Sequence, residues 1–123
     1  MNNRGKLAEL KAAIYLEEHK YKLVDFNYIC RFGEIDIIAK NRKYIAFIEV
    51  KMRDENSTIL PREFVDENKQ KKIIACAESF LSKHPTSLQP RFDVVQVIIE
   101  DGKVLSIDYI TNAYDTTGYN FIF

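Results

Sequence analysis

Two acidic side chains and one lysine interrupt apolar stretches of this sequence in a way that suits chemistry. Glu49 and Lys51 stand two residues apart in the run Tyr-Ile-Ala-Phe-Ile-Glu-Val-Lys-Met, and Asp36 breaks the segment Glu-Ile-Asp-Ile-Ile. Burying a lone carboxylate or ammonium group costs free energy unless the group is paired or bound to a metal. We therefore take Asp36, Glu49 and Lys51 as the first candidates for a functional site.

Phosphodiester cleavage is a reaction that such a group suits. Carboxylate oxygens are the ligands that Mg²⁺ prefers, and a bound cation lowers the pKa of its water and neutralises charge on a phosphate. A neighbouring ammonium group can orient that water or stabilise the transition state. We expect Asp36 and Glu49 to bind Mg²⁺ or Mn²⁺, and Lys51 to play the second role. An isolated Glu-x-Lys is more often a solvated strand face, so the second acid, Asp36, carries the functional interpretation.

The two strands that must position these residues are expected at 34–40 and 44–52. In the first, Ile35, Ile37 and Ala39 alternate with polar residues, and only Ile38 breaks the pattern. Directly opposed residues of a hairpin share a face, so the turn decides whether Asp36 meets Glu49. A two-residue or a four-residue turn brings both acids and Lys51 to one face. A three-residue turn without a bulge separates them.

The remaining segments predict one α/β domain that spans residues 1–123. Turn and helix-end signals, including Asp66 before a helix and Asp101-Gly102 between two strands, divide the chain into seven elements. Their order is α-β-β-β-α-β-β, which implies a mixed central sheet flanked by helices. Besides the two strands above, we expect helices at 4–19 and 66–83 and strands at 21–30, 91–99 and 103–110.

Four further charged residues are candidates for the same site. Glu9 faces the apolar stripe of the first helix, where it supports the metal site or is a partly buried acid satisfied by a nearby Arg or Lys. Lys69 extends the inner stripe of the second helix and is expected to approach the site or a phosphate. Lys72 is a nucleic-acid contact or, like Lys71, part of a solvated helix face. Arg53, just past the third strand, is a phosphate contact or a loop cation.

Composition excludes several classes of protein. No apolar run approaches the length of a membrane span, and no apolar leader opens the chain, so we expect a cytoplasmic protein. The two histidines and two cysteines lack the spacing of a zinc site, and we expect Cys30 and Cys76 to be reduced and mostly buried. The net charge is zero, whereas a typical nucleic-acid-binding protein is basic.

Four segments, in this order and spacing, resemble those of a known family. They are GKLAELKAAIYL from Gly5, GEIDII from Gly33, FIEVKMR from Phe47 and RFDVV from Arg91. They are similar to the YraN-like family of the restriction-endonuclease-like, PD-(D/E)XK superfamily of nucleases, and distantly to archaeal Holliday junction resolvases. The resemblance covers nearly the whole chain. Lys20 departs from the family pattern, which usually has glycine at this position.

The resemblance implies a restriction-endonuclease-like αβββαβ core and an active site of Glu9, Asp36, Glu49 and Lys51. Glu34 belongs to a matching motif and is expected to support the site. Lys69 falls where the superfamily often places a lysine or glutamine on the second helix.

Two functions remain open from the sequence. The first is a metal-dependent endonuclease or exonuclease acting on DNA, with branched or single-stranded DNA as possible substrates. The second is a non-catalytic nucleic-acid-binding or scaffolding module that keeps the nuclease-like fold, which the neutral charge favours. The aromatic C-terminal segment 111–123 is expected to pack on its own sheet or on a second subunit, which makes a homodimer an open option.

Overall fold

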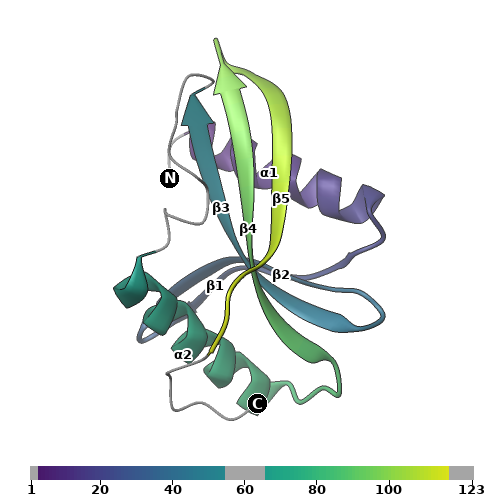
Figure 1. Cartoon of the computed structure of the whole chain (residues 1–123), viewed down its shortest axis with the longest axis vertical. Coiled ribbons are helices and arrows are strands. Elements are labelled where there is room, and N and C mark those ends of the chain that lie inside the picture. Colours follow the sequence, from purple (N-terminus) through teal and green to yellow (C-terminus); the bar gives the residue numbers. More distant parts are fainter. Residues whose placement is uncertain (1–2, 55–65, 117–123) are drawn as a thin grey trace.

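The computed structural model of the chain describes residues 3–54 and 66–116. The predicted order of helices and strands is confirmed, although β3 and β5 extend further than expected (Figure 1). The elements are α1 (Asn3–Glu18), β1 (Lys22–Cys30), β2 (Gly33–Lys40), β3 (Tyr44–Asp54), α2 (Glu67–Lys83), β4 (Gln89–Glu100) and β5 (Lys103–Tyr114).

The strands form one mixed sheet in the order β1-β2-β3-β4-β5. Neighbours are antiparallel except β3 and β4, which run parallel and are joined by the crossover through α2. The predicted α/β, restriction-endonuclease-like architecture is therefore confirmed. At the β4–β5 turn, Asp101 and Gly102 have φ angles of 51° and 75°, as the hairpin signal in the sequence predicts.

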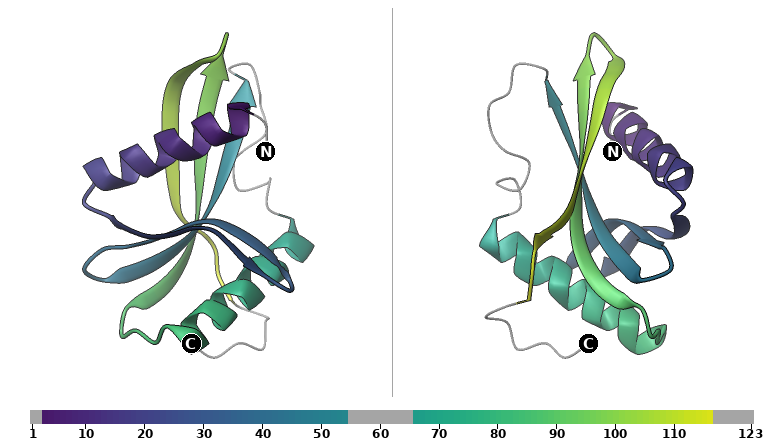
Figure 2. Two further views of the ribbon diagram at one scale, coloured as in Figure 1. Left: turned by 180° about the vertical axis from the view of Figure 1, so that it is seen from behind. Right: turned by 45° about the vertical axis from the view of Figure 1, so that its right-hand side comes forward.

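The two helices cover opposite faces of the sheet, and each covers its own hydrophobic core (Figure 2). Four residues of α1 are buried against one face: Ala8, Ala12, Ala13 and Leu16. Five residues of α2 are buried against the other face: Ile73, Ile74, Cys76, Ala77 and Phe80. β3 and β4 contribute to both cores because their side chains alternate and both their faces are covered.

The β1–β2 hairpin changes face part-way along its length. Asn27 has a φ of 50°, and Phe26 before it and Tyr28 after it pair with Ile37 and Ile35 of β2. Ile37 packs in the α1 core, whereas Ile35 and Tyr28 belong to the α2 core. The alternation of Ile35, Ile37 and Ala39 in the sequence predicts one shared face, which is wrong for Ile35 and Ile37. On β1 the change of face coincides with the left-handed Asn27, which breaks the alternation of that strand.

Helix α1 ends in a turn that explains the unusual residue at position 20. The N–H of Tyr21 donates to the carbonyl of Leu16, and the N–H of Lys20 donates to that of Glu17. This pattern places Lys20 in the left-handed conformation, with a φ of 70°. Glycine adopts that conformation without steric cost, which accounts for the glycine of the family pattern.

A buried ion pair within the segment RFDVV of β4 is hydrogen-bonded to β5. Asp93 is fully buried, and its carboxylate accepts hydrogen bonds from the Arg91 guanidinium, the Tyr109 hydroxyl and the backbone N–H of Asn112. The Arg91 guanidinium also donates to the Tyr21 hydroxyl. The Arg91 and Asp93 side chains of this family motif therefore stabilise the fold.

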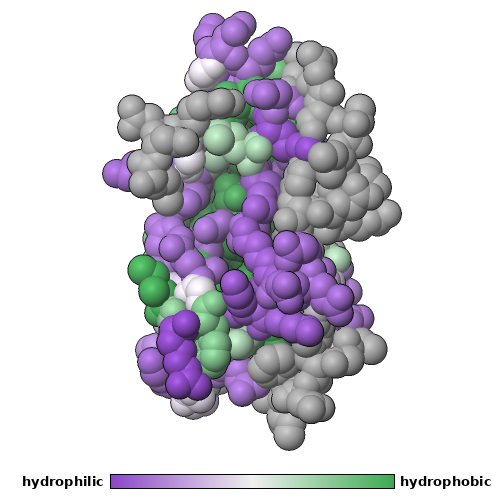
Figure 3. Space-filling model, turned by 90° about the vertical axis from the view of Figure 1, so that its left-hand side faces the viewer, coloured by the Kyte–Doolittle hydropathy of each residue, from purple (hydrophilic) through white to green (hydrophobic). Residues whose placement is uncertain are grey.

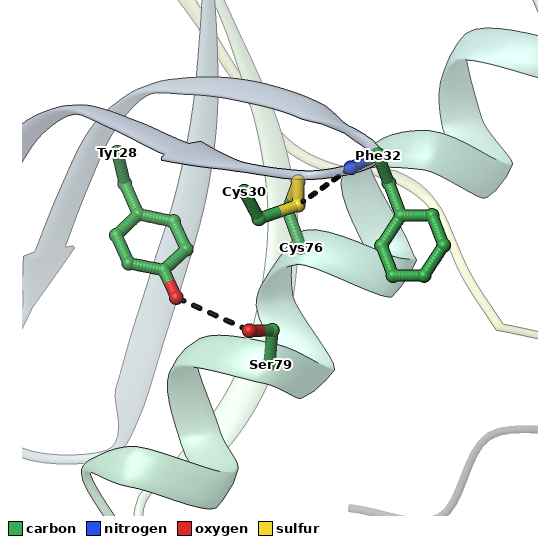
Figure 4. The surroundings of a disulfide bond; sticks show 5 residues. All are labelled: Tyr28, Cys30, Phe32, Cys76 and Ser79. Carbon is green, nitrogen blue, oxygen red and sulfur yellow. Dashed lines mark hydrogen bonds between the residues drawn. A yellow bond between two sulfur atoms is a disulfide. The ribbon is translucent and has the colours of Figure 1, made fainter.

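The two cysteines form a disulfide bond, so the expectation that they are reduced is wrong (Figure 4). Cys30 ends β1 and Cys76 lies on α2, with their Cα atoms 5.8 Å apart and a sequence separation of 46. Such pairing depends on tertiary structure, because two cysteines this far apart in sequence carry no spacing signal. Nearby, the Tyr28 hydroxyl hydrogen-bonds Ser79 of α2, 3.3 Å away.

Part of the C-terminal segment packs on the sheet of its own chain, which is one of the two arrangements expected for it. Tyr114 pairs with Phe92 of β4, and their rings stack with centroids 5.4 Å apart. The aromatic residues from 117 onward lie outside the described residues. Neither α1 nor α2, the helices within the described ranges, is long and apolar enough to cross a membrane.

Candidate functional site

The β2–β3 turn adopts the four-residue alternative and brings the two acids into register. Lys40 pairs with Ile45 and Ile37 with Ile48, so the same register puts Asp36 opposite Glu49. Asn41 stabilises this turn, since its side-chain oxygen accepts hydrogen bonds from the backbone N–H groups of Lys43 and Tyr44. The side chain of Asn41 thus stabilises the turn whose length determines that Asp36 and Glu49 lie opposite each other.

The regular pairing of β2 with β3 ends beside Asp36. Ile37 and Ile48 are the last pair of the ladder, and Asp36 Oδ2 then accepts a hydrogen bond of 2.8 Å from the backbone N–H of Val50. The carboxylate thereby takes the place of a main-chain acceptor, which keeps this N–H satisfied where the strands separate. Asp36 is consequently held beside Glu49.

Glu49 lies between two lysines from different elements. Its side chain is buried, with 6% of its surface exposed, and its Oε1 is 3.1 Å from Lys51 Nζ and 2.5 Å from Lys69 Nζ. Lys69 is positioned by the start of α2, where its backbone N–H donates to the capping carboxylate of Asp66. The expectation that Lys69 approaches the site is confirmed.

Asp36, Glu49 and Lys69 line a cavity of about 590 Å³ between the β1–β2 hairpin and the first turns of α2, whereas Lys51 is not part of its lining. The cavity lies at the N-terminal end of α2. On the side of the molecule to which that end points, most of the surface is hydrophilic, with smaller apolar patches between (Figure 3). The lining of the cavity is Gly33, Glu34, Asp36, Glu49, Asp66, Asn68, Lys69, Lys72 and Ile73.

Lys72 and Arg53 have different positions relative to this cavity. Lys72 is exposed, lines the cavity and packs across from Gly33, where an added Cβ would lie 3.7 Å from the Lys72 Cβ. Arg53, expected just past the third strand, lies within β3 and is half-buried. It is not part of the cavity lining. Asn68 lines the cavity but carried no sequence signal beyond its place in a polar helical turn.

Glu9 approaches the same acids from α1, on the opposite face of the sheet. Its pKa is raised by partial burial and by the charges of Glu34 and Glu49, while a hydrogen bond from the Asn27 side chain acts in the other direction. Asn27 is therefore a hydrogen-bond partner of Glu9. Asn27 was missed by sequence reasoning, although asparagine within an apolar strand is a recognised sign of a left-handed residue.

The charges of the site perturb one another strongly. Burial and the nearby charge of Glu49 raise the pKa of Asp36 to about 7, against an ordinary value of 3.8. Burial and the adjacent Lys69 cation lower the pKa of Lys51. Burial acts in the same direction on the pKa of Lys69, but hydrogen bonds to Glu49 and Lys51 and the charges of Glu49 and Asp36 raise it on balance. Such a cluster of perturbed groups in a cavity is typical of a functional site.

A family model described as uncharacterised protein family UPF0102 matches residues 8–97, which contain all of these residues. The chain belongs to this family. UPF0102, also called the YraN family, is a PD-(D/E)XK nuclease-like family, so the resemblance identified from sequence is confirmed.

UPF0102 proteins from several bacteria are similar to the chain over nearly its full length. The protein of Caldanaerobacter subterraneus is 38% identical over 113 residues, which cover 89% of this chain and 93% of the relative. That of Trichlorobacter lovleyi is 40% identical, with coverages of 90% and 89%. That of Syntrophus aciditrophicus is 42% identical, with coverages of 90% and 87%. These names establish membership of the family and no particular activity.

The donor set of this UPF0102 chain fits a hard divalent cation that keeps part of its water shell. Asp36 and Glu49 supply carboxylate oxygens, and burial together with the charge of Glu49 raises the pKa of Asp36. Within residues 3–54 and 66–116, no three His, Cys, Asp or Glu side chains are placed to hold a metal by themselves. Mg²⁺ commonly binds through one or two carboxylates, with waters and substrate phosphates as its other ligands.

Proposed function

We propose that this protein is a nuclease that cleaves phosphodiester bonds in DNA with the help of Mg²⁺ or Mn²⁺. The observation that carries the proposal is that Asp36, Glu49 and Lys69 line one cavity from three elements of the fold. Lys51 lies beside this group, 3.1 Å from Glu49. A structural ion pair would not need a second acid whose pKa is raised to about 7 by burial and by the charge of Glu49.

Each residue has a separate role in this proposal. Asp36 and Glu49 would hold the cation, which supplies an activated water and neutralises charge on the phosphate. Lys51 lies 3.1 Å from Glu49 and is placed to orient the attacking water or to stabilise the charge that develops on the phosphate. Glu9 would complete the acidic surroundings from α1.

The outer residues of the cavity would hold the nucleic acid. Lys69 and Lys72 project from α2 at the cavity, and Lys69 is 38% exposed, so it is accessible to a phosphate oxygen. Arg53 continues β3 beyond Lys51 and would contact the strand outside the cavity. A cytoplasmic location, where the DNA of a bacterium lies, is part of the same proposal.

The zero net charge supports a second candidate, a non-catalytic nucleic-acid-binding or scaffolding module. In that case the Glu49–lysine cluster would be a structural ion pair, and binding would not require a metal. The two candidates therefore differ in what a metal ion does. Cleavage that depends on Mg²⁺ or Mn²⁺ belongs only to the first.

The deciding experiment is a cleavage assay on a matched set of linear duplex, single-stranded and branched DNA. Each substrate is incubated with the purified protein and Mg²⁺, Mn²⁺ or EDTA, and an Asp36→Asn preparation purified in parallel reveals contaminating nuclease. We expect cleavage with either metal, none with EDTA and none by Asp36→Asn. Binding of DNA without cleavage of any substrate would favour the scaffolding module.

A further inference from the structure

A second hollow, of about 350 Å³, lies between α1 and β1 next to the acidic site. Its α1 side is formed by positions 6, 9, 10 and 13, which lie on one face of the helix because their spacing follows the helical repeat. We call this hollow the α1–β1 groove. Its lining residues are Lys6, Glu9, Leu10, Ala13, Phe26 and Asn27.

The groove is apolar yet open to solvent. Leu10 is 59% exposed and Phe26 is 45% exposed, although both are large hydrophobic side chains. A single exposed apolar residue needs no explanation, but here two of them line one hollow together with Ala13. Such a concave surface with an aromatic ring is suited to a flat, apolar ligand.

The position of Phe26 follows from the left-handed residue beside it. Asn27, with a φ of 50°, breaks the alternation of β1, so Phe26 lines the α1–β1 groove while Tyr28 packs against Phe80 of α2. The same Asn27 hydrogen-bonds Glu9. One backbone feature therefore places both an exposed ring and the partner of a site acid.

Glu9 connects the groove to the candidate active site. Its carboxylate lines the groove and interacts electrostatically with Glu34 and Glu49, both of which line the acidic cavity. At another point of the groove, Lys6 supplies a positive charge one helical turn before Glu9 and Leu10. The groove thus offers an apolar surface for a ring and a cation for a phosphate, beside the place where a phosphodiester would be cleaved.

We propose that the α1–β1 groove binds one unpaired nucleobase of the nucleic acid substrate. Phe26 stacks against the base, Leu10 and Ala13 form the opposite wall, and Lys6 pairs with an adjacent phosphate. This inference rests on the proposed nuclease function and narrows its substrate class. Bases in an intact duplex are stacked on each other, so the groove selects a strand with an unpaired nucleotide beside the scissile phosphate, as in single strands and at branch points.

The test measures base stacking and not cleavage. A short single strand with the fluorescent base 2-aminopurine at successive positions is titrated with protein, with Ca²⁺ replacing Mg²⁺ to limit cleavage. We expect quenching at one position by the wild type. Phe26→Leu should lose the quenching and bind about ten-fold more weakly, since stacking on an aromatic ring is worth roughly 1–3 kcal/mol per base.

Two variants serve as matched controls. Phe26→Tyr retains an aromatic ring and should restore quenching and affinity. Leu105→Ala is the control for Leu10→Ala, because Leu105 is also an exposed leucine, 48% exposed, but lies on β5 outside the groove. This variant should bind the strand like the wild type. Leu10→Ala should weaken binding. Thermal melting of every variant excludes misfolding as the cause of a loss.

The outcomes separate this inference from the proposed function. Equal quenching and affinity for wild type and Phe26→Leu would overturn the groove proposal while the cleavage assay still decides the nuclease. Quenching that depends on Phe26 in a protein that cleaves nothing would support the groove and contradict the nuclease. A wild type that binds no strand would overturn the groove. So would a dimer in light scattering that Phe26→Asp converts to monomers, because the groove would then be a contact between two copies of the chain.

Discussion

The carboxylate of Asp36 accepts a hydrogen bond of 2.8 Å from the backbone N–H of Val50, just beyond the last regular pair of β2 and β3. Val50 stands between Glu49 and Lys51, so this bond connects the first acid to the segment that carries the other two site residues. The acid is held by main chain in a largely buried place. A mutation of Asp36 can therefore remove the unfavourable charge and keep the hydrogen bond to Val50 that stabilises the fold.

Asp36→Asn should abolish cleavage while leaving the fold intact. The asparagine oxygen can still accept the bond from Val50, but the amide removes the negative charge that a cation needs. We expect activity to fall by at least about 100-fold, since even residues behind metal ligands often cost 10- to 100-fold. The melting temperature at pH 8 should be unchanged or higher, because a crowded buried charge is gone. Wild-type cleavage rates in this variant would refute the role of Asp36.

The raised pKa of Asp36 predicts a specific dependence of stability on pH. Its ordinary value of 3.8 rises to about 7 in the folded protein, so the folded state binds the proton more tightly than the unfolded state does. This contribution to stability is complete below about pH 3.8 and is lost as pH rises to about 7. Denaturant unfolding of metal-free protein between pH 4 and 8 measures it, and Asp36→Asn should lack this component.

Added Mn²⁺ should reverse that trend. The cation binds the ionised form of Asp36, so its stabilising effect should grow between pH 6 and pH 8, while Asp36→Asn should gain little at either pH. Thermal melting with and without Mn²⁺ gives the comparison. An equal shift in both proteins would mean that the cation binds elsewhere.

Lys69 and Lys71 offer a matched pair on one helix. Lys69 contacts Glu49 at 2.5 Å, whereas Lys71 is an exposed residue of α2 that does not line the cavity. Lys69→Gln should reduce cleavage by about ten-fold or more, as expected for the loss of a charged group near the phosphate. Lys71→Gln should stay within about two-fold. Similar losses in both variants would point to a general effect of surface charge.

Reduction of the Cys30–Cys76 disulfide should destabilise the protein. The bond joins residues with a sequence separation of 46. For such a loop, chain entropy predicts that the bond adds roughly 4 kcal/mol to the free energy of unfolding, and typical measured values are about 2–4 kcal/mol. Urea unfolding with and without dithiothreitol measures the loss, and a Cys30→Ala, Cys76→Ala protein should not respond to the reductant. Two free thiols in the untreated, purified protein would contradict the prediction.

Two truncations separate the parts of the C-terminal segment. Ending the chain after Asn112 removes Tyr114, which stacks on Phe92, and should lower stability by about 2 kcal/mol. Ending it after Thr116 keeps that contact and should cost less. Light scattering on the full chain and both variants tests the homodimer. Equal melting temperatures for all three would mean that Tyr114 adds nothing to the fold.

The types of the secondary elements were predictable because the pattern of apolar residues is local. The stripe of Ile73, Cys76, Ala77 and Phe80 after Asp66 predicted α2 and its start, and both agree with the structure. Glu49 and Lys51 share a face of β3 because side chains two apart in a strand always do. By contrast, the position of Glu9 on the apolar stripe of α1 did not by itself predict that Glu9 approaches these acids. The same position also suits a partly buried acid that pairs with a nearby Arg or Lys.

The sequence by itself determined which residues are costly to bury and which strands and helices carry them, since these depend on neighbours within a few positions. Only the tertiary structure decided that Asp36 lies opposite Glu49, because the turn at Asn41 allowed more than one register. It also decided the Cys30–Cys76 bond and the change of face at Asn27. Each of these depends on a backbone conformation or on a contact between distant segments, and the spacing of residues along the chain does not encode either one.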